Sequence, residues 1–248
     1  MGLYVRGAAT LLASWDEYAS GSASATVQRL KGVVAAVFPS GPERHVYNNA
    51  LPDRDLAPTE RAAALNAMER AYGSAGVERY AVWAHGSDRG MQAELAARGY
   101  TLDTCTRAMG MSLDDVPVPA PDVRIERLED WDEYLGYLWS VGVPEGLLSE
   151  ADPSEFHVLV ARLAGENVAT AIAFDHEGDC GIYNMPTLES FRRRGLGTAL
   201  TARHVHDAAE RGCSTASLQS TPMAERVYAA VGFGDLGRFL EYVPGRSP

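Results

Sequence analysis

The chain has 248 residues, of which 46% are hydrophobic and 22% are charged, and its formal net charge is −11 at pH 7. This globular composition excludes collagen-like, coiled-coil, disulfide-rich and disordered proteins. The negative charge argues against a nucleic-acid partner, because binding to a phosphate backbone requires a basic surface. The length fits two domains of about 120 residues each.

The sequence contains no sign of membrane insertion or export. No stretch approaches the roughly 18 consecutive apolar residues of a membrane helix, and the N-terminus lacks a basic-then-apolar signal with a cleavage site. Cys105, Cys180 and Cys213 are widely spaced and form no CxxC pair. They therefore predict neither a disulfide framework nor a zinc site. We expect a cytoplasmic protein without a membrane partner, in which the cysteines are small core residues.

A proline-rich stretch indicates where the two domains meet. Residues 114–121 (DDVPVPAP) contain three prolines and no apolar periodicity, which is typical of an extended linker. We therefore predict domains at 1–118 and 119–248. Residues 1–120 carry 11 basic and 13 acidic side chains, whereas residues 121–248 carry 11 and 20. The acidity belongs to the second half.

The second half begins with a strand, a helix and a hairpin. Residues 123–128 alternate as a strand does, and Trp131, Tyr134, Leu135 and Leu138 recur at the spacing of one helix face. The apolar runs 157–163 and 168–174 are separated by Gly-Glu-Asn, a tight-turn signal that predicts an antiparallel hairpin.

Two strand–helix pairs follow the hairpin. The pattern predicts a strand at 182–187, a helix at 195–211 that stops at Gly212, and a strand at 215–219. Thr221 and Pro222 form an N-cap and N1 pair for a short helix that ends at Gly232. A last strand is expected at 239–243.

The first half repeats part of this order. The similar segments are 45–49 and 181–185, 62–65 and 197–200, 76–83 and 212–218, and 94–100 and 227–233. Tyr47 and Tyr100 are separated by about the same length of chain as Tyr183 and Phe233. We interpret this as an internal duplication; the alternative is chance similarity between alanine-rich helices.

The strongest local motif is Phe-Arg-Arg-Arg-Gly-Leu-Gly at residues 191–197, between a predicted strand and a predicted helix. Gly195 and Gly197 allow close approach of a ligand, and the free N–H groups of a first helical turn attract an anion. Three arginines add positive charge. The motif predicts a pyrophosphate or nucleotide phosphate site, and a solvated arginine run before an ordinary helix is the alternative. Leu200 replaces the third glycine of a dinucleotide fingerprint, and no Walker lysine follows.

Two motifs in this half resemble the GNAT superfamily of acetyl-CoA-dependent N-acetyltransferases. Residues 192–197 match its pattern Arg/Gln-x-x-Gly-x-Gly/Ala, and residues 224–233 match its aromatic-bearing helix that ends in Gly-Phe. The resemblance covers roughly residues 122–245. It implies an α/β (α+β) fold with two GNAT-like mixed-sheet domains in tandem, each a central twisted sheet flanked by helices.

The resemblance also implies a mechanism, in which acetyl-CoA gives its acetyl group directly to an amine without an acyl-enzyme. Tyr228 falls where the family commonly places the general acid for the departing thiolate, which a phenol can supply; the alternative is a core aromatic residue. The backbone at Met185 and Thr187 would pair with the pantetheine arm. The implied cofactor-binding residues are Met185, Thr187, Arg192, Arg193, Arg194, Gly195, Leu196, Gly197, Thr198 and Thr221.

Some family features are absent or altered. Thr221 stands where the family often has Asn or Ser, so a cofactor contact and simple N-capping remain alternatives. Glu189 and Glu126 are both poorly placed for a general base, and we assign none. His204 and His206 lie two residues apart and would point to different faces of a helix, so we predict no metal.

The acidic segment 122–155 contains ten Asp and Glu against two Arg. It would favour a cationic amine as acceptor if it roofs the acceptor pocket, as the corresponding family region does, and it is otherwise a solvated acidic surface. Trp131, Tyr137 and Trp139 are candidates to line such a pocket, although helical spacing favours core packing for Trp131.

The first half lacks the motifs of the second. Residues 53–60 (DRDLAPTE) contain no glycine and bring acids in place of arginines, and Leu95 stands at the place of Tyr228. We expect a degenerate copy that does not bind coenzyme A. The predicted protein is an N-acetyltransferase for a primary amine of a small molecule, acting as a monomer or homodimer. The alternatives are a non-catalytic acyl-CoA-binding or regulatory module and an unrelated nucleotide-binding enzyme.

Overall fold

The computed structural model describes residues 1–40, 48–114, 123–143 and 146–245. They form two compact units, each of which is built from separate stretches of chain. The N-terminal unit comprises Trp15–Arg107 and Gly237–Pro248, and the C-terminal unit comprises Met1–Ser14 and Ala108–Leu236. The predicted boundary at 118/119 and residues 115–121 of the predicted linker lie outside the described residues. No helix in the described part of the chain combines the length and the apolar character required to cross a membrane.

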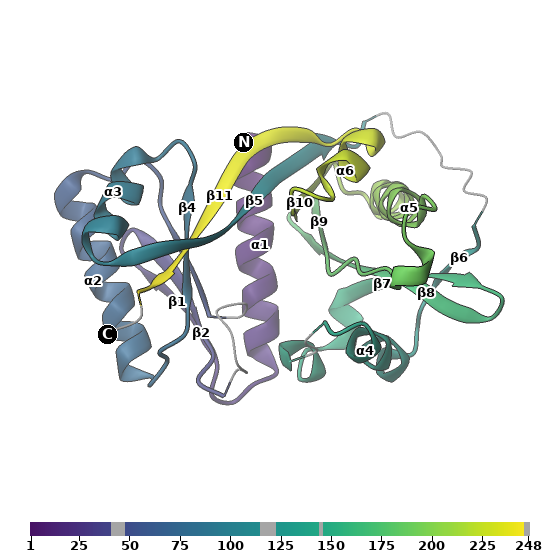
Figure 1. Ribbon diagram of the computed structural model, residues 1–248, viewed down its shortest axis with the longest axis horizontal. Coiled ribbons are helices and arrows are strands. Elements are labelled where there is room, and N and C mark those ends of the chain that lie inside the picture. Colours follow the sequence, from purple (N-terminus) through teal and green to yellow (C-terminus); the bar gives the residue numbers. More distant parts are fainter. Residues whose placement is uncertain (41–47, 115–122, 144–145, 246–248) are drawn as a thin grey trace. The chain divides into compact units, whose positions relative to one another are not determined.

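The N-terminal unit is a mixed sheet with helices α2 and α3 packed together against it (Figure 1). Within this unit the strand order is β1-β2-β3-β4-β11-β5. Strands β3 and β4 are parallel, and the pairs β1–β2, β2–β3 and β4–β11 are antiparallel. The core beneath α2 contains fully buried Leu65, Met68 and Tyr72. The elements are β1 (Thr26–Leu30), β2 (Val33–Val37), β3 (Asn49–Pro52), α2 (Pro58–Ser74), β4 (Ala81–His85) and α3 (Arg89–Ala97).

In the C-terminal unit the strand order of the sheet is β5-β10-β9-β8-β7-β6. Strands β9 and β10 are parallel, whereas β6, β7, β8 and β9 pair in antiparallel fashion. Helices α4 and α5 lie on opposite sides of β7 and β8 (Figure 1). The elements are β6 (Ile125–Arg127), α4 (Trp131–Ser140), β7 (Phe156–Leu163), β8 (Glu166–His176), β9 (Asp179–Tyr183), α5 (Leu196–Glu210), β10 (Thr215–Ser220) and α6 (Glu225–Val231), with short 3-10 helices at Gly146–Ser149, Pro153–Glu155 and Glu189–Phe191.

Three elements have residues in both units: α1 (Leu3–Ser20), β5 (Tyr100–Ser112) and β11 (Gly234–Pro244). The first part of α1 packs on the sheet of the C-terminal unit, where a Cβ atom on Gly7 would lie only 2.7 Å from the Cβ of Ser217. Its last part packs in the N-terminal unit, where Trp15 makes an edge contact with Trp83. Helix α1 was not predicted from the sequence.

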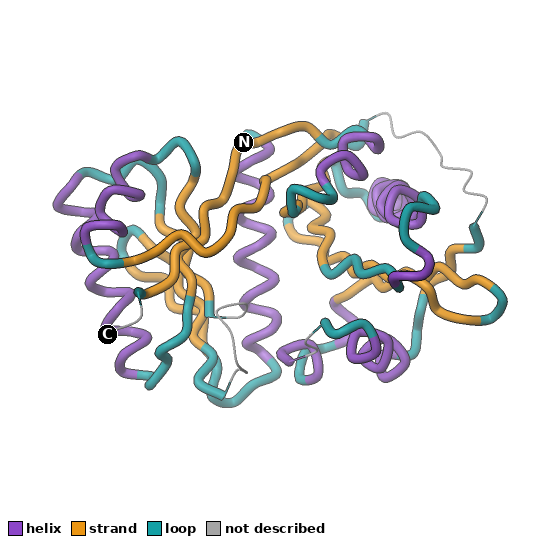
Figure 2. The backbone as a smooth tube through the Cα atoms, in the orientation of Figure 1, coloured by secondary structure: helices purple, strands orange, loops and turns teal. Residues whose placement is uncertain are grey.

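The same order of elements occurs twice along the chain. The sequence β3-α2-β4-α3-β5 is repeated as β9-α5-β10-α6-β11, and the alternation of strands and helices can be followed in Figure 2. The last strand of each repeat, β5 or β11, does not lie beside the preceding strand of its own repeat but beside strands of the other repeat. Strand β11 pairs with β4 in the register Phe239↔His85, and β5 neighbours β10. Of the similar segments found in the sequence, residues 45–47 lie outside the described residues.

Most predicted elements of the second half are confirmed, among them the β7–β8 hairpin, α5 with Gly195 as its N-cap, and β10. The predicted helix start at Thr221 is wrong. Residues 221–224 form a turn in which the Ala224 N–H donates to the Thr221 carbonyl (3.0 Å), and α6 begins at Glu225. The Thr-Pro pair fits such a turn as well as a helix start, because proline is also favoured in turns.

The predicted strand 182–187 ends earlier than expected. Strand β9 stops at Tyr183, and Asn184 has a left-handed backbone conformation (φ +41°). Pro186 then brings no N–H group that could continue a strand ladder. The chain returns to β8 instead, through a bridge between Thr187 and Ala169 and a hydrogen bond from the Leu188 N–H to the Val168 carbonyl.

Candidate functional site

A cavity of about 700 Å³ opens in the C-terminal unit where β9 and β10 separate. The two strands are paired as far as Ile182 and Leu218. Beyond that point the chain after β9 turns toward β8, while β10 continues through Gln219 to Ser220. The carboxyl ends of parallel strands in α/β sheets are a common place for ligands, and the volume is that of a small-molecule site.

The N-terminus of α5 forms one wall of this space, which we call the α5 cavity. Gly195 caps the helix in the left-handed conformation (φ +77°), and Arg193 is also left-handed (φ +63°). The first-turn N–H groups of a helix have no partner within the helix, and together with the helix dipole they favour an anion. A Cβ atom on Gly197 would lie 3.3 Å from the Val227 side chain and 3.7 Å from the Met185 sulfur. A larger side chain at 197 would therefore fill the cavity.

The α5 cavity brings together ten of the eleven site residues predicted from the sequence. They are Met185, Thr187, Arg192, Arg193, Gly195, Leu196, Gly197, Thr198, Thr221 and Tyr228.

The three arginines of the loop have different surroundings. Arg192 lines the cavity, and its Nε donates to the Thr187 carbonyl (3.3 Å). Arg193 also lines the cavity and has an exposed side chain. Arg194 is the predicted residue outside the cavity wall: its guanidinium lies 5.1 Å from the centre of the Phe191 ring and donates to the Ser190 carbonyl (3.4 Å). Two guanidinium groups are thus placed to meet phosphate oxygens.

Tyr228 reaches the cavity from α6. Its ring makes an edge contact with Phe233 (6.3 Å between centroids) and packs on the core of the C-terminal unit. Burial raises the pKa of Tyr228 above its ordinary value of 10.0. The phenol therefore stays protonated at neutral pH, the state that a general acid requires. Tyr228 thus lies both at the cavity wall and against the core, and its role as general acid stays a prediction.

The cavity wall also includes Met185, Thr187 and Thr221. Met185 is also anchored to α5, because the Thr201 hydroxyl donates to its sulfur (3.5 Å). The Thr221 carbonyl accepts a hydrogen bond from the Ala224 N–H. Thr221 lines the cavity and does not cap α6. N-capping by Thr221 is therefore wrong, and its contact with the cofactor stays a prediction.

Several further lining residues were not predicted from the sequence: Val141, Val143, Gln219, Met223 and Val227. Gln219 directly follows the paired part of β10, and its position at a strand end is the one signal that could have indicated it. Met223 is 88% exposed, which is unusual for a large apolar side chain. Nothing in the local pattern marks Val141 and Val143, which reach the cavity from the chain after α4.

Three described acids of segment 122–155 have partners away from the α5 cavity. Glu133 accepts from Arg162 (2.8 Å) and Asn167 (2.7 Å), and Asp130 caps α4 by accepting from the Glu133 N–H (3.0 Å). Asp152 caps a 3-10 helix. Of the described residues that line the α5 cavity, none is acidic. Glu133 instead lines a separate pocket together with Tyr137 and Glu166.

The aromatic residues of α4 are also accounted for. Trp131 packs on Tyr134 and Phe156, as its helical spacing predicts, and its Nε1 donates to the Leu148 carbonyl (3.1 Å). The Tyr137 hydroxyl donates to the Pro186 carbonyl (3.4 Å), which ties α4 to the chain beside the cavity. Trp139 is 75% exposed.

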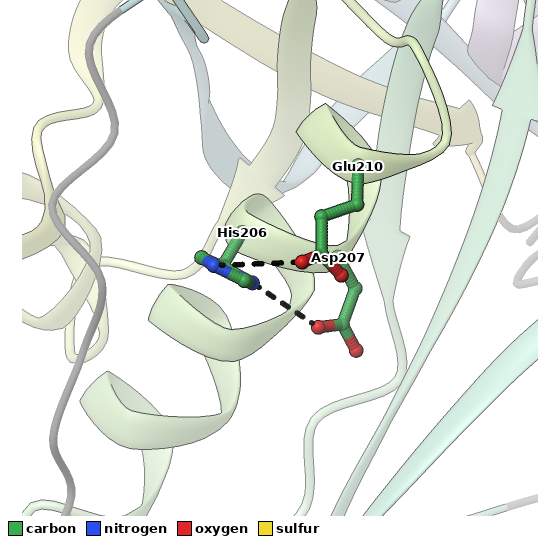
Figure 3. A group of neighbouring side chains, drawn as sticks. All are labelled: His206, Asp207 and Glu210. Carbon is green, nitrogen blue, oxygen red and sulfur yellow. Dashed lines mark ion pairs between the residues drawn. The ribbon is translucent and has the colours of Figure 1, made fainter.

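A group of potential metal ligands lies on α5, where His206, Asp207 and Glu210 come close together (Figure 3). The His206 Nδ1 lies 3.5 Å from Asp207, and its Nε2 lies 3.9 Å from Glu210. The two carboxylates therefore meet different nitrogens of one ring, and Arg203 already pairs with Asp207 at 2.6 Å. One ligand atom from each of the three residues lies within 4.8 Å of the other two, and Asp207 among them is already engaged by Arg203. His204 lies in the core, apart from this group.

The corresponding loop of the N-terminal unit is filled by its own side chains. Asp55, before α2, is left-handed (φ +58°), and its N–H donates to the Asp88 carboxylate (3.1 Å). Asp88 is buried and also caps α3 by accepting from the Met91 N–H (2.9 Å). The Arg54 guanidinium donates to Ser87 (3.1 Å). A buried protein carboxylate thus accepts a backbone N–H in the loop before α2.

Comparison with known proteins gives consistent results. Residues 117–233 match the family model described as "Acetyltransferase (GNAT) family". A search of curated proteins found no match. Among solved structures, a GCN5-related N-acetyltransferase from Kribbella flavida is similar over 100% of this chain and 97% of its own, with a TM-score of 0.78 and 20% identity.

Two other solved structures have the same fold at lower similarity. One from Sphaerobacter thermophilus, also titled a GCN5-related N-acetyltransferase, has a TM-score of 0.62 at 18% identity and covers 88% of this chain and 83% of its own. A tandem GNAT protein from the clavulanic acid biosynthesis pathway has a TM-score of 0.61 at 14% identity, over 94% and 89% of the two chains. At these identities the likeness concerns the fold.

Proposed function

The chain belongs to the GNAT superfamily through its residues 117–233 and is an acyltransferase, and from this premise we propose that it transfers the acetyl group of acetyl-CoA to a primary amine of a small molecule. The transfer is direct, without an acyl-enzyme. One observation carries the proposal: the cavity that begins at the α5 N-terminus also contains the Tyr228 side chain. An anion site and a proton donor thus share one space.

The residues at the α5 N-terminus fit a pyrophosphate. Arg192 and Arg193 line the cavity beside the first-turn N–H groups, and Gly195 and Gly197 leave the backbone accessible. Leu196 and Thr198 belong to the same turn. The backbone at Met185 and Thr187 would hold the pantetheine arm, and Thr221 would contact it from the other side. Arg194, which stacks on Phe191, would act on the cofactor through its charge and by shaping the loop.

Tyr228 would supply the proton that coenzyme A needs on leaving. As the amine nitrogen bonds to the thioester carbon, the carbon–sulfur bond breaks and the sulfur carries negative charge. The phenol, kept protonated by burial, gives its proton to that sulfur. Positioned proton transfer of this kind contributes about 10²- to 10⁴-fold to a rate.

We further propose that the N-terminal half is a degenerate copy without a coenzyme A site. The hydrogen bond between Asp55 and Asp88 supports this proposal. The three free cysteines favour a reducing compartment such as the cytoplasm, and we expect a monomer or a homodimer.

The test combines binding and turnover. Calorimetry with acetyl-CoA should give one site per chain, and release of free thiol should require both acetyl-CoA and a primary amine. Acetyl-CoA binding without thiol release in a broad panel of primary amines would favour the non-catalytic module. Failure to bind acetyl-CoA at all would overturn the proposed function.

A further inference from the structure

The residues that line the α5 cavity limit the kind of amine that can bind there. The inference drawn from them rests on the proposed function. Away from the phosphate loop, the cavity wall consists of apolar side chains, among them Val141, Val143, Ile182, Met223 and Val227, and of uncharged polar ones such as Asn184 and Gln219. Met223 is also 88% exposed at this position. An apolar group on the acceptor would cover it from water, which is favourable.

The charges in the wall are those of Arg192 and Arg193. The two charges of a bound pyrophosphate would balance them. Two acids of the preceding segment have other partners: Glu133 accepts from Arg162 and Asn167, and Asp130 caps the α4 N-terminus. An ammonium group entering this space would lose hydration without gaining a counter-ion from the described lining residues.

Such surroundings select the neutral form of an amine. Desolvation without a compensating charge disfavours the charged form and lowers the pKa of an amine. An alkylamine, with a pKa near that of lysine at about 10.4, is almost entirely protonated at pH 7, whereas an α-amino group titrates at about 7.7 to 8.0. At pH 7, an α-amino group therefore supplies far more of the reactive, uncharged form than an alkylamine does.

We propose that the acceptor is a weakly basic primary amine attached to an apolar group, and that it enters the cavity uncharged. Its nitrogen lone pair forms the bond to the thioester carbon, and the carbon–sulfur bond breaks. Tyr228 protonates the sulfur, and the proton that the nitrogen loses passes through solvent to the phenolate. The products are the amide and coenzyme A thiol, with Tyr228 restored.

The experiment measures kcat/KM between pH 6 and 9.5 for phenylalaninamide and 2-phenylethylamine, which share an aromatic body and differ mainly in basicity. For each amine we expect a tenfold rise per pH unit up to the pKa of that amine. At pH 7 the neutral fractions differ by about two orders of magnitude, and phenylalaninamide should be preferred accordingly. A profile for 2-phenylethylamine that levels off near pH 7 or 8 would reveal a base on the enzyme and overturn the inference.

A charge-introducing variant provides the second arm. Met223→Glu places a carboxylate at an exposed position of the wall and should lower kcat/KM for phenylalaninamide while raising it at least tenfold for the dication putrescine. Trp139→Glu, at an exposed position of α4 outside the wall, is the matched control. It should leave kcat/KM unchanged for both phenylalaninamide and putrescine. Preference of the unmodified enzyme for putrescine over both aromatic amines would overturn the inference and leave the proposed function intact. Absence of thiol release with every amine would instead overturn the proposed function.

Discussion

The Asp88 carboxylate accepts a hydrogen bond from the backbone N–H of Asp55, at 3.1 Å. The same carboxylate caps α3 through the Met91 N–H at 2.9 Å. In the C-terminal unit, Arg193 and Gly195 are left-handed before the corresponding helix, and both line an open cavity. The loop before α2 thus donates to a buried protein carboxylate, whereas the loop before α5 borders space for a ligand.

Asp88→Ala should lower the free energy of unfolding, because it removes an N-cap and leaves the Asp55 N–H without this acceptor. Loss of an N-cap alone costs about 0.5 to 2 kcal/mol. Urea unfolding measures the change, and acetyl-CoA affinity should remain that of the unmodified protein. A variant that binds acetyl-CoA more weakly would show that the N-terminal unit takes part in cofactor binding.

Gly197→Glu should abolish acetyl-CoA binding. The new side chain starts 3.3 Å from Val227 and 3.7 Å from Met185, and it brings a negative charge to a site for phosphates. Acetyl-CoA at 100 times its dissociation constant should stabilise the unmodified protein by about 2.7 kcal/mol, seen as a rise in Tm that the variant lacks. Ala62→Glu, at the matching place in α2, is the control and should bind normally. Equal loss in both variants would mean that the phosphate loop was wrongly assigned.

Tyr228→Phe should lower kcat by about 10²- to 10⁴-fold, the contribution of a positioned general acid, without changing the dissociation constant of acetyl-CoA. Because burial raises the pKa of Tyr228 above 10.0, kcat of the unmodified enzyme should show no loss of the acid form below pH 10. Rapid kinetics and calorimetry separate the two effects. A normal kcat in the variant would return Tyr228 to a purely structural role.

Glu241→Gln should stabilise the protein at alkaline pH. Burial raises the pKa of Glu241 from 4.5 to about 7, and the Thr106 hydroxyl is its hydrogen-bond donor at 3.4 Å. The folded state therefore favours the protonated carboxyl, so the stabilisation is complete below pH 4.5 and is lost as the pH rises through 7. The loss is about 3 kcal/mol at most. The gain in Tm for the variant should be larger at pH 8.5 than at pH 5, and a pH-independent gain would contradict this assignment.

His204 should make the C-terminal unit sensitive to acid. Complete burial lowers its pKa from 6.5 to about 4, so the folded state holds the neutral ring. The corresponding stability is present above pH 6.5 and is lost as the pH falls through 4, by about 3 kcal/mol. His204→Leu should flatten the dependence of Tm on pH over this interval. His206, which is partly exposed on the same helix, provides a control in His206→Leu, for which the slope should remain.

The local patterns of the sequence were sufficient for most of the C-terminal unit. Gly195 and Gly212 mark the two ends of α5, and glycine signals of this kind can be recognised in the sequence without tertiary information. The turn at residues 164–165 defines the β7–β8 hairpin in the same way. The helix start at Thr221 could not be read locally, because a Thr-Pro pair suits a turn as well as an N-cap; the strand end at Tyr183 depends on the left-handed Asn184.

By itself, the sequence determined the family motifs, the repeated order of elements and ten of the residues that line the cavity, since each depends on neighbours within a few positions of the chain. Tertiary structure alone decided that β11 pairs with β4, that Asp88 fills the N-terminal loop, and that Val141, Val143 and Met223 complete the α5 cavity. These relationships join segments that are distant in the chain. Strand pairing and side-chain packing between such segments leave no periodic signal in either one.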